Sequence, residues 1–271
     1  MAYKLIAIDI DGTLLNAQGD ITPAVLSCLH GLRKHYHVVL ATGRHHTTVL
    51  PYYQQLELDT PIICCNGSYL YHPETKDYQY KQPIAMEDVA FFIEHTQTLD
   101  LIAYVDDRII LKHTHPANYI TTLEQWAQTL PISIRPKIER VDDLNVALTQ
   151  SKHVWTFVTE GDSSDIEALI SLPHLQQNFC YEHSWFNRIG FNKIGNSKGN
   201  LLSQYLVHKG IHPDEVLAIG DNDNDVSMID LAGMGVALSN ATPKLKARAN
   251  YLTQGSNNDT GLLEALALLS K

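Results

Sequence analysis

Short apolar runs alternate with longer amphipathic segments along this chain, and several of the apolar runs end in polar residues. These runs occupy residues 5–8, 36–41, 61–65 and 216–219. Because they are apolar at nearly every position, they are typical of strands that a parallel sheet buries on both faces. Helix start signals such as Thr22-Pro23 lie between them. The alternation predicts an α/β fold with a doubly wound, Rossmann-like parallel sheet.

The segments between the apolar runs are expected to form helices, each of which returns the chain to the start of the next strand. Serine or threonine caps, proline in the first turn and a closing glycine mark several of their ends. The expected helices begin at Thr22-Pro23 and Thr242-Pro243 and also occupy residues 45–56, 197–209, 221–230 and 259–269.

Residues 83–190 have a pattern that differs from the pattern on either side. They contain strand and helix signals, for example at 89–96, 102–105 and 154–159, but no strand there ends in a cluster of Asp, Thr or Lys. A tyrosine-rich hairpin over residues 68–82 precedes this stretch. We therefore expect residues 1–82 and 191–271 to form a core domain and residues 83–190 to form an inserted second domain.

Composition narrows the class of protein. The chain of 271 residues has 18% charged and 44% hydrophobic residues, which fits a globular protein with a sizeable core. A net charge of -10 argues against a nucleic-acid surface and against binding to anionic membranes. No run approaches a membrane span, and the N-terminal segment lacks the regions of a signal peptide. Because 4 cysteines are too few for a disulfide scaffold, we expect a cytoplasmic protein.

Polar residues that suit one kind of chemistry follow the apolar runs. Since the carboxyl ends of parallel strands share one edge of a sheet, we expect these residues to lie together. Alternate residues of a strand share a face, which would bring Asp9 and Asp11 to one reacting atom. The clusters are Asp9-Ile10-Asp11-Gly12-Thr13, Thr42-Gly43-Arg44, Asn66-Gly67 and Gly220-Asp221-Asn222-Asp223-Asn224-Asp225, with Ser197-Lys198-Gly199 at the start of an expected helix.

These clusters together provide what phosphoryl transfer requires. One aspartate can attack phosphorus as a nucleophile, and a second carboxylate can protonate the leaving oxygen and then activate water. Carboxylates of Asp9 and Asp221 suit Mg²⁺, which prefers oxygen ligands and also binds substrate phosphate. The Thr42 hydroxyl, backbone amides and Lys198 can bind the remaining phosphate oxygens.

The same residues also have interpretations without chemistry. Residues 5–12 fit a strand followed by an Asp-Gly turn, Thr42 fits a helix N-cap, and Lys198 fits a solvated helix position. We interpret Asp223 as a surface residue, and we expect Arg44 either to clamp the substrate or to orient its own loop. The presence of every cluster on one chain favours the chemical interpretation.

The order and spacing of these clusters resemble the four motifs of the haloacid dehalogenase superfamily of phosphatases. Asp9-Ile10-Asp11-Gly12-Thr13 is similar to its first motif, Thr42 to its second, Lys198 to its third and Gly220-Asp221-x-x-Asn224-Asp225 to its fourth. The insertion between the second and third motifs resembles the large C2 cap of the Cof-type branch. The resemblance implies a parallel-sheet catalytic core with an inserted α+β C2-type cap that governs substrate choice.

The resemblance also implies roles for individual residues, with Mg²⁺ as the cofactor. Asp9 would be the nucleophile and a metal ligand, and Asp11 the general acid and base that also gives its backbone carbonyl to the metal. Asp221 would be a metal ligand, and Asp225 would hold either the waters of the metal or Lys198. The implied phosphate-binding residues are Ile10 through its backbone amide, Thr42, Gly43, Lys198 and Asn224, and the substrate-binding candidates are Arg44 and Asn66.

Further stretches of the chain narrow the implied substrate. Residues 42–46, 58–61, 63–67, 126–131, 195–199 and 246–250 are similar to the enterobacterial pyridoxal phosphate phosphatases of this branch. The resemblance implies a small phosphorylated metabolite as the partner, with pyridoxal 5′-phosphate leading and sugar phosphates such as fructose 1,6-bisphosphate and erythrose 4-phosphate as the alternative. Aromatic residues of the expected cap (Tyr104, Trp155, Tyr181, His183 and Trp185) could meet a pyridine ring, but packing is the favoured interpretation for each.

Other functions remain open at this point. A phosphomutase would use the same residues but pass the phosphoryl group to a second acceptor. A phospho-acceptor signalling module also combines strand-end aspartates with Thr and Lys, although its acceptor follows a middle strand and it has no inserted cap. A non-catalytic binding protein on this fold would be expected to lack Asp9 or Asp11, and both are present.

Overall fold

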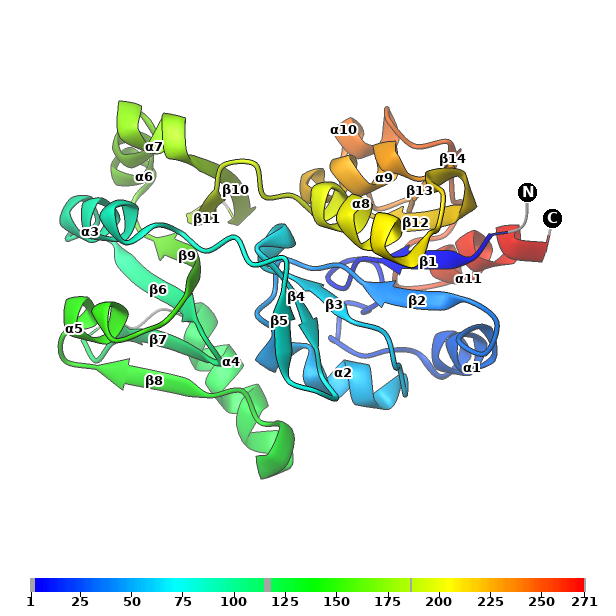
Figure 1. Cartoon of the computed structure of the whole chain (residues 1–271), viewed down its shortest axis with the longest axis horizontal. Coiled ribbons are helices and arrows are strands. Elements are labelled where there is room, and N and C mark those ends of the chain that lie inside the picture. The colour runs from blue at the N-terminus through cyan, green and yellow to red at the C-terminus, as the bar shows by residue number, and fades with distance from the viewer. Residues whose placement is uncertain (1–2, 115–117, 186, 271) are drawn as a thin grey trace. The chain divides into compact units, whose positions relative to one another are not determined.

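The computed structural model describes residues 3–114, 118–185 and 187–270 (Figure 1). The chain divides into two compact units. The first takes in the chain up to Arg44, the segment Tyr52–Tyr80 and the chain from Ser197 onwards, and the second takes in His45–Pro51 and Lys81–Asn196. The second unit is therefore inserted into the first at two places along the sequence, whereas one insertion was expected.

A five-stranded parallel sheet forms the centre of the first unit (Figure 1). Its strands are β1 (Leu5–Ile8), β2 (His37–Leu40), β12 (Val216–Gly220), β13 (Met234–Ala237) and β14 (Tyr251–Leu252), in the order β14-β13-β12-β1-β2. Ile8 pairs in register with Leu40 on one side and with Ile219 on the other. The residues that follow β1, β2 and β12 therefore emerge at the same edge of the sheet, as the apolar runs predict.

Helices cover both faces of this sheet, which confirms the doubly wound α/β class. α8 (Lys198–Lys209) and α9 (Val226–Leu231) pack on one face, where Leu5 and Ala7 share a buried cluster with Leu202 and Met228. α1 (Pro23–Leu32) contacts α11 (Gly261–Leu266) and lies on the other side in Figure 1. Two further helices are α10 (Pro243–Lys246) and α2 (Leu50–Gln55). The first two residues of α2, Leu50 and Pro51, belong to the second unit.

Helix ends follow the sequence signals closely. The Thr22 hydroxyl accepts from the Val25 backbone N–H at the start of α1, and the Ser197 hydroxyl accepts from the Asn200 N–H at 3.1 Å at the start of α8. α8 ends at Gly210, which takes the left-handed conformation with a φ of 65°. The Ser197 cap fixes where α8 begins, and hence the position of Lys198 in its first turn.

The helix expected over residues 45–56 was wrong as a single element. The structure has a 3₁₀ turn over His46–Thr48 and then α2 from Leu50. Pro51 lies at the second position of α2, where it lacks an N–H to donate to a preceding turn, and its ring would clash with the carbonyl four residues earlier. The proline therefore prevents one helix from running through both parts.

A small antiparallel sheet continues the first unit beyond β2. It consists of β3 (Ile62–Cys64), β4 (Tyr69–His72) and β5 (Asp77–Gln79), in that order. A single parallel bridge between Ala41 and Ile63 joins it to the end of β2. The expected tyrosine-rich hairpin is thus present, and the turn between β3 and β4 comes close to the loop that follows β2.

The second unit has a six-stranded sheet and its own core. The sheet order is β10 (Phe179–Trp185), β11 (Arg188–Lys193), β9 (Val154–Glu160), β6 (Asp100–Val105), β7 (Arg108–Lys112) and β8 (Ile138–Val141), and only β7 and β8 pair in parallel. Its helices are α3 (Met86–His95), α4 (Asn118–Thr129), α5 (Leu144–Thr149), α6 (Ser163–Ile170) and α7 (Pro173–Asn178). Phe92 stacks on Phe157 at 4.4 Å and meets Phe191 edge-on at 4.9 Å in the centre of this core.

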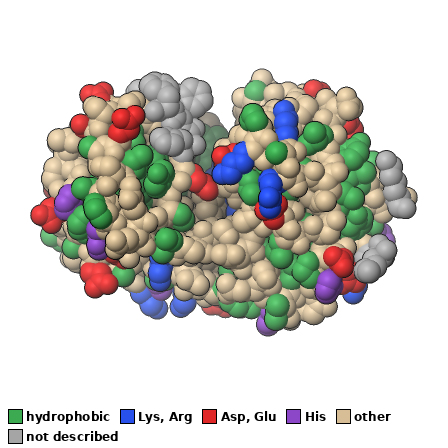
Figure 2. All heavy atoms as spheres, turned by 90° about the horizontal axis from the view of Figure 1, so that it is seen from above, with side chains coloured by type: hydrophobic (Ala, Val, Ile, Leu, Met, Phe, Trp, Pro, Cys, Tyr) green, Lys and Arg blue, Asp and Glu red, His purple; other side chains and the backbone are tan. Residues whose placement is uncertain are grey.

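The outer surface is mixed in character. Figure 2 shows acidic, basic and hydrophobic side chains interspersed on one face, and the lysines and arginines seen there do not form one continuous patch. Within the described ranges, no helix is both long enough and apolar enough to cross a membrane.

We expect Phe157→Ala to lower the free energy of unfolding by about 3–5 kcal/mol, because the ring is fully buried against Phe92 and its removal leaves a cavity. Val146→Ala is the control, since Val146 is 49% exposed and its change should cost no more than about 0.5 kcal/mol. Urea unfolding followed by circular dichroism measures both. Equal losses in the two variants would contradict a packed aromatic core in the second unit.

Candidate functional site

The predicted functional side chains come from loops at one edge of the central sheet. The Asp9 N–H donates to the Ile219 carbonyl at 3.0 Å, and the Thr42 N–H donates to the Ile63 carbonyl at 2.9 Å. These bonds continue the strand pairing one residue beyond β1 and two residues beyond β2, so both loops start from fixed positions. Every strand-end cluster named from the sequence lies within the first unit.

Lys198 is completely buried and lies between two carboxylates. Its Nζ donates to Oδ1 of Asp9 and to Oδ1 of Asp225, each at 2.6 Å. The side chain has no exposed surface, which excludes the alternative of a solvated helix position. The Ser197 cap places this lysine in the first turn of α8.

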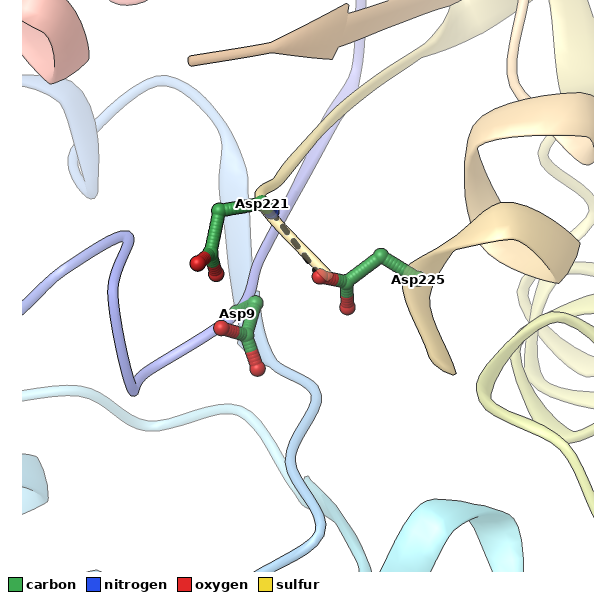
Figure 3. A group of neighbouring side chains, drawn as sticks. All are labelled: Asp9, Asp221 and Asp225. Carbon is green, nitrogen blue, oxygen red and sulfur yellow. Dashed lines mark hydrogen bonds between the residues drawn. The ribbon is translucent and has the colours of Figure 1, made fainter. Parts of the chain in front are cut away.

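Three carboxylates, those of Asp9, Asp221 and Asp225, converge at this place, as Figure 3 shows. One oxygen of each of Asp9, Asp221 and Asp225 lies within 4.8 Å of the others. Asp225 is fixed from the opposite side, because its Oδ2 accepts from the backbone N–H groups of Asp221 and Asn222, both at 3.0 Å. Asp225 thus supports the loop after β12 with one oxygen and holds Lys198 with the other.

The crowding of buried carboxylates changes their acidity. Burial raises the pKa of Asp9 well above its usual range, and the charge of Asp225 raises it further, although Lys198 partly offsets both effects. Burial together with Asp225 raises the pKa of Asp221 to about 6. Burial alone would lower the pKa of Lys198, but the carboxylates of Asp225 and Asp9 outweigh it and raise this pKa.

The donor set fits a hard divalent cation. Three carboxylates face one ammonium group, so the cluster carries excess negative charge in a buried place. A cation bound by oxygens of Asp9 and Asp221 would relieve the repulsion that raises their pKa values, and Mg²⁺ prefers oxygen ligands of this kind. The buried acidic cluster can therefore hold a metal ion.

Asp11 does not belong to this group of carboxylates and pairs with Arg44 instead. The Arg44 Nε donates to Oδ2 of Asp11 at 2.8 Å, and Nη2 donates to Oδ1 at 2.6 Å. Such a bidentate contact fixes the orientation of both side chains. The guanidinium also lies 5.3 Å from the ring centre of Tyr52.

The expectation that Asp9 and Asp11 share one strand face was wrong. β1 ends at Ile8, and the chain turns at once, because the carbonyl of Ile10 accepts from the N–H groups of Leu14 and Leu15, both at 3.0 Å. Asp11 therefore lies in this turn and not on a strand, so the alternation of strand side chains does not apply to it.

The backbone of the loop after β1 closely approaches the loop after β12. Gly12 has a φ of 80°, and a Cβ at this position would lie 2.2 Å from Oδ2 of Asp221. A side chain at position 12 would therefore overlap with the Asp221 carboxylate. Gly12 is needed both for its left-handed conformation and for this contact.

The predicted phosphate-binding residues line the same loops. Thr42 is buried and its hydroxyl accepts from the Arg44 N–H at 3.0 Å, so it orders its own loop. Gly43 packs against the side chain of Asn66, where a Cβ would lie 3.2 Å from the amide oxygen. The Asn224 amide in turn donates to that oxygen at 3.2 Å. The structure thus brings Thr42, Gly43, Asn66 and Asn224 together.

Two residues that contact Asp221 had no role in the sequence analysis. The Thr13 hydroxyl donates to Oδ1 of Asp221 at 3.0 Å. The Asn240 amide donates to the Gly12 carbonyl at 2.9 Å and approaches Oδ2 of Asp221 at 3.4 Å. Asn240 follows the end of β13, so the rule that polar residues at strand ends form the site could have identified it.

Other residues considered in the sequence analysis make contacts of a different kind. Asp223 is exposed, accepts from the Thr242 hydroxyl at 2.7 Å and pairs with Lys244, as expected of a surface residue. In the second unit Tyr104 and Trp155 are buried, and the Trp155 indole donates to the Asp106 carbonyl, which fits packing. Tyr181 is 40% exposed, whereas the side chains of His183 and Trp185 lie outside the described part of the structure.

Comparison with known proteins agrees with this geometry. The family model of haloacid dehalogenase-like hydrolases matches residues 6–266. The pyridoxal phosphate phosphatase YbhA of Escherichia coli (strain K12) is 35% identical over 96% of each chain, and the 5-amino-6-(5-phospho-D-ribitylamino)uracil phosphatase YitU of Bacillus subtilis (strain 168) is 28% identical over 94% of this chain and 93% of its own. The crystal structure of a haloacid dehalogenase-like hydrolase from Bacteroides thetaiotaomicron superposes with a TM-score of 0.85 at 29% identity, covering 98% of this chain and 99% of that one. The chain therefore belongs to the haloacid dehalogenase-like hydrolases and is a phosphatase.

Proposed function

We propose that this phosphatase hydrolyses the phosphate ester of a small metabolite through an aspartyl phosphate on Asp9, with Mg²⁺ as cofactor and pyridoxal 5′-phosphate as substrate. The observation that carries the proposal is the buried cluster of Asp9, Asp221, Asp225 and Lys198 at the carboxyl edge of the sheet. A cluster in which largely buried carboxylates and one buried lysine converge is costly to fold, which favours a catalytic role for it.

In the first half of the proposed reaction, a carboxylate oxygen of Asp9 attacks phosphorus and the bond to the ester oxygen breaks. Asp11, as a carboxylic acid, gives its proton to that departing oxygen, so that the alcohol leaves and the phosphoryl group stays on Asp9. The bidentate contact to Arg44 has to loosen for Asp11 to do this, since it occupies both oxygens of the carboxylate.

In the second half, Asp11 takes a proton from water, and the water oxygen attacks phosphorus. The bond between phosphorus and Asp9 breaks, which returns the Asp9 carboxylate and releases inorganic phosphate. Asp11 thereby acts first as acid and then as base, and it is again protonated for the next turnover.

The remaining residues hold the phosphate while these bonds change. The backbone amides of Ile10 and Gly43, the Thr42 hydroxyl, Lys198 and Asn224 are the proposed phosphate donors. Asp9, Asp221, the backbone carbonyl of Asp11 and, through waters, Asp225 are the proposed metal site. A bound Mg²⁺ would offset negative charge on the nucleophile and on the phosphate oxygens.

The choice of substrate rests on the relatives and on the inserted unit. The relative at 35% identity is named for pyridoxal phosphate, while the one at 28% is named for a different phosphorylated metabolite. We propose that the second unit, which contains the cap expected at residues 83–190, selects among such substrates. The alternative is a sugar-phosphate phosphatase, in which the same residues of the first unit would catalyse the same reaction.

Asp9→Asn should lower kcat by about 10³-fold or more, because an amide is not a nucleophile toward phosphorus. Phosphate release with Mg²⁺ is measured on pyridoxal 5′-phosphate, fructose 1,6-bisphosphate, erythrose 4-phosphate and glucose 6-phosphate. We expect pyridoxal 5′-phosphate to give the highest kcat/KM. Asp223→Asn is the matched control, since it removes an exposed carboxylate two residues from Asp221 and should leave turnover unchanged. A higher kcat/KM for a sugar phosphate would overturn the substrate, and an active Asp9→Asn variant would overturn the mechanism.

Mg²⁺ should raise the melting temperature of the metal-free protein, and Asp221→Asn should remove this shift. Because burial and neighbouring carboxylates raise the pKa of Asp9 and bring that of Asp221 to about 6, protons compete with the metal at acidic pH. We therefore expect the Mg²⁺ concentration that gives half of the maximal increase in melting temperature to be about tenfold higher at pH 5.5 than at pH 7.5. A shift independent of both Asp221 and pH would contradict this metal site.

Gly12→Ala should lower kcat/KM by about 10²-fold, because its Cβ would displace the Asp221 carboxylate. Gly19→Ala is the matched control: Gly19 also has a φ of 80°, but a Cβ there would meet nothing within 4 Å. Both variants bear the cost of a left-handed alanine, about 1–2 kcal/mol of stability. Steady-state kinetics with calorimetry separates the two effects, and equal kinetic losses would show that the clash with Asp221 is not the cause.

A further inference from the structure

The turn between β3 and β4 has an unusual backbone. Cys65, Asn66 and Gly67 follow one another with φ values of 47°, 53° and 89°, all in the left-handed region. Asparagine and glycine tolerate this region, whereas cysteine seldom adopts it. A run of such residues persists only where the surroundings hold it in place, and it commonly marks a functional site.

This turn holds the loop after β2. The Cys65 N–H donates to the Arg44 carbonyl and the Asn66 N–H donates to the Thr42 carbonyl, both at 3.0 Å. Gly43, between those two acceptors, lies against the Asn66 side chain. The left-handed turn therefore fixes both the backbone of this loop and the place where the Asn66 amide lies.

The same turn also approaches the start of α8. A Cβ on Gly67 would lie 2.2 Å from the carbonyl oxygen of Ser197 and 2.6 Å from its carbonyl carbon. Ser197 caps α8 and precedes Lys198. The turn thus packs against two of the loops to which phosphate-binding residues belong.

The Asn66 side chain reaches a third loop. Its Oδ1 accepts from Nδ2 of Asn224 at 3.2 Å. Among the described residues, Oδ1 of Asn224 is buried and has no hydrogen-bond partner. An amide nitrogen carries two hydrogens, so the bond to Asn66 leaves one for another acceptor.

We infer that Asn66 is a positioning residue, which orients the Asn224 amide so that its nitrogen donates to a phosphate oxygen. This inference rests on the proposed function, in which Asn224 is a phosphate donor. An amide turned the other way would present its carbonyl oxygen to an anionic group and repel it. Because the Oδ1 of Asn66 accepts from Asn224, it selects the favourable orientation without having to touch the substrate.

Asn66→Gly tests this inference while keeping the backbone, because glycine adopts the left-handed region without strain. We expect kcat/KM to fall by about tenfold and inorganic phosphate to inhibit about tenfold more weakly, the usual scale for loss of an orienting partner. Asn224→Ala should lower kcat/KM by about 10²-fold. Lys76→Gly is the matched control, since Lys76 is an exposed left-handed residue of the β4–β5 turn and should leave both constants unchanged.

The double variant Asn66→Gly/Asn224→Ala decides whether Asn66 acts through Asn224. We expect the Asn66 change to have less than about a twofold effect once Asn224 is alanine. The inference would be overturned if Asn66→Gly lowered kcat/KM equally in the wild-type and Asn224→Ala proteins, or if it caused no loss in the wild-type protein. If the wild-type protein releases no phosphate from any ester, the proposed function fails, and calorimetric binding of inorganic phosphate to the same variants still decides the role of Asn66.

Discussion

The two ion pairs of the buried Lys198 ammonium are the interactions on which the first unit depends. The ammonium lies between Asp9, which follows β1, and Asp225, which follows β12, and has no exposed surface. Removing one partner of a buried ion pair leaves an uncompensated charge and typically costs about 3–5 kcal/mol. The Lys198 charge is therefore balanced only if three features are in place together. These are the register of β1 with β12, the cap of α8 and the loop around Asp221.

Much of this arrangement could be predicted from the sequence, because it follows from a single rule. Apolar runs identify the buried strands, and the polar residues after them identify one edge of the sheet; Asp9, Thr42 and Asp221 were found in this way. Contacts that depend on the path of a loop could not be found. The turn after Ile8 sends Asp11 to Arg44, and Pro51 divides an expected helix. Asn240 follows the end of β13, so the same rule could have identified it, but its contacts with Gly12 and Asp221 depend on the path of its loop.

The site depends on close approach between the backbones of its loops as well as on the identity of its side chains. Gly12 lies directly against Asp221 and Gly67 against Ser197, so these loops come closer than a side chain would allow, and Gly43 lies against Asn66 in a tight contact. The hydrogen bonds of Asn66 and Asn240 then join loops that glycine has brought together. A rigid base of this kind keeps charged groups aligned in the absence of a ligand, which is what electrostatic preorganisation requires.

The position of β1 in the sheet has a consequence for how the protein is made. Leu5 pairs with His37 on one side but with Val216 on the other, and Lys198 bonds to an aspartate that is 189 positions away. As the chain leaves the ribosome, β2 soon becomes available, whereas the other edge of β1 stays open until β12 has been synthesised. Contacts that close such long loops form late. A nascent chain thus carries Asp9 almost from the start and gains Lys198, the buried partner of that carboxylate, only when the last third emerges.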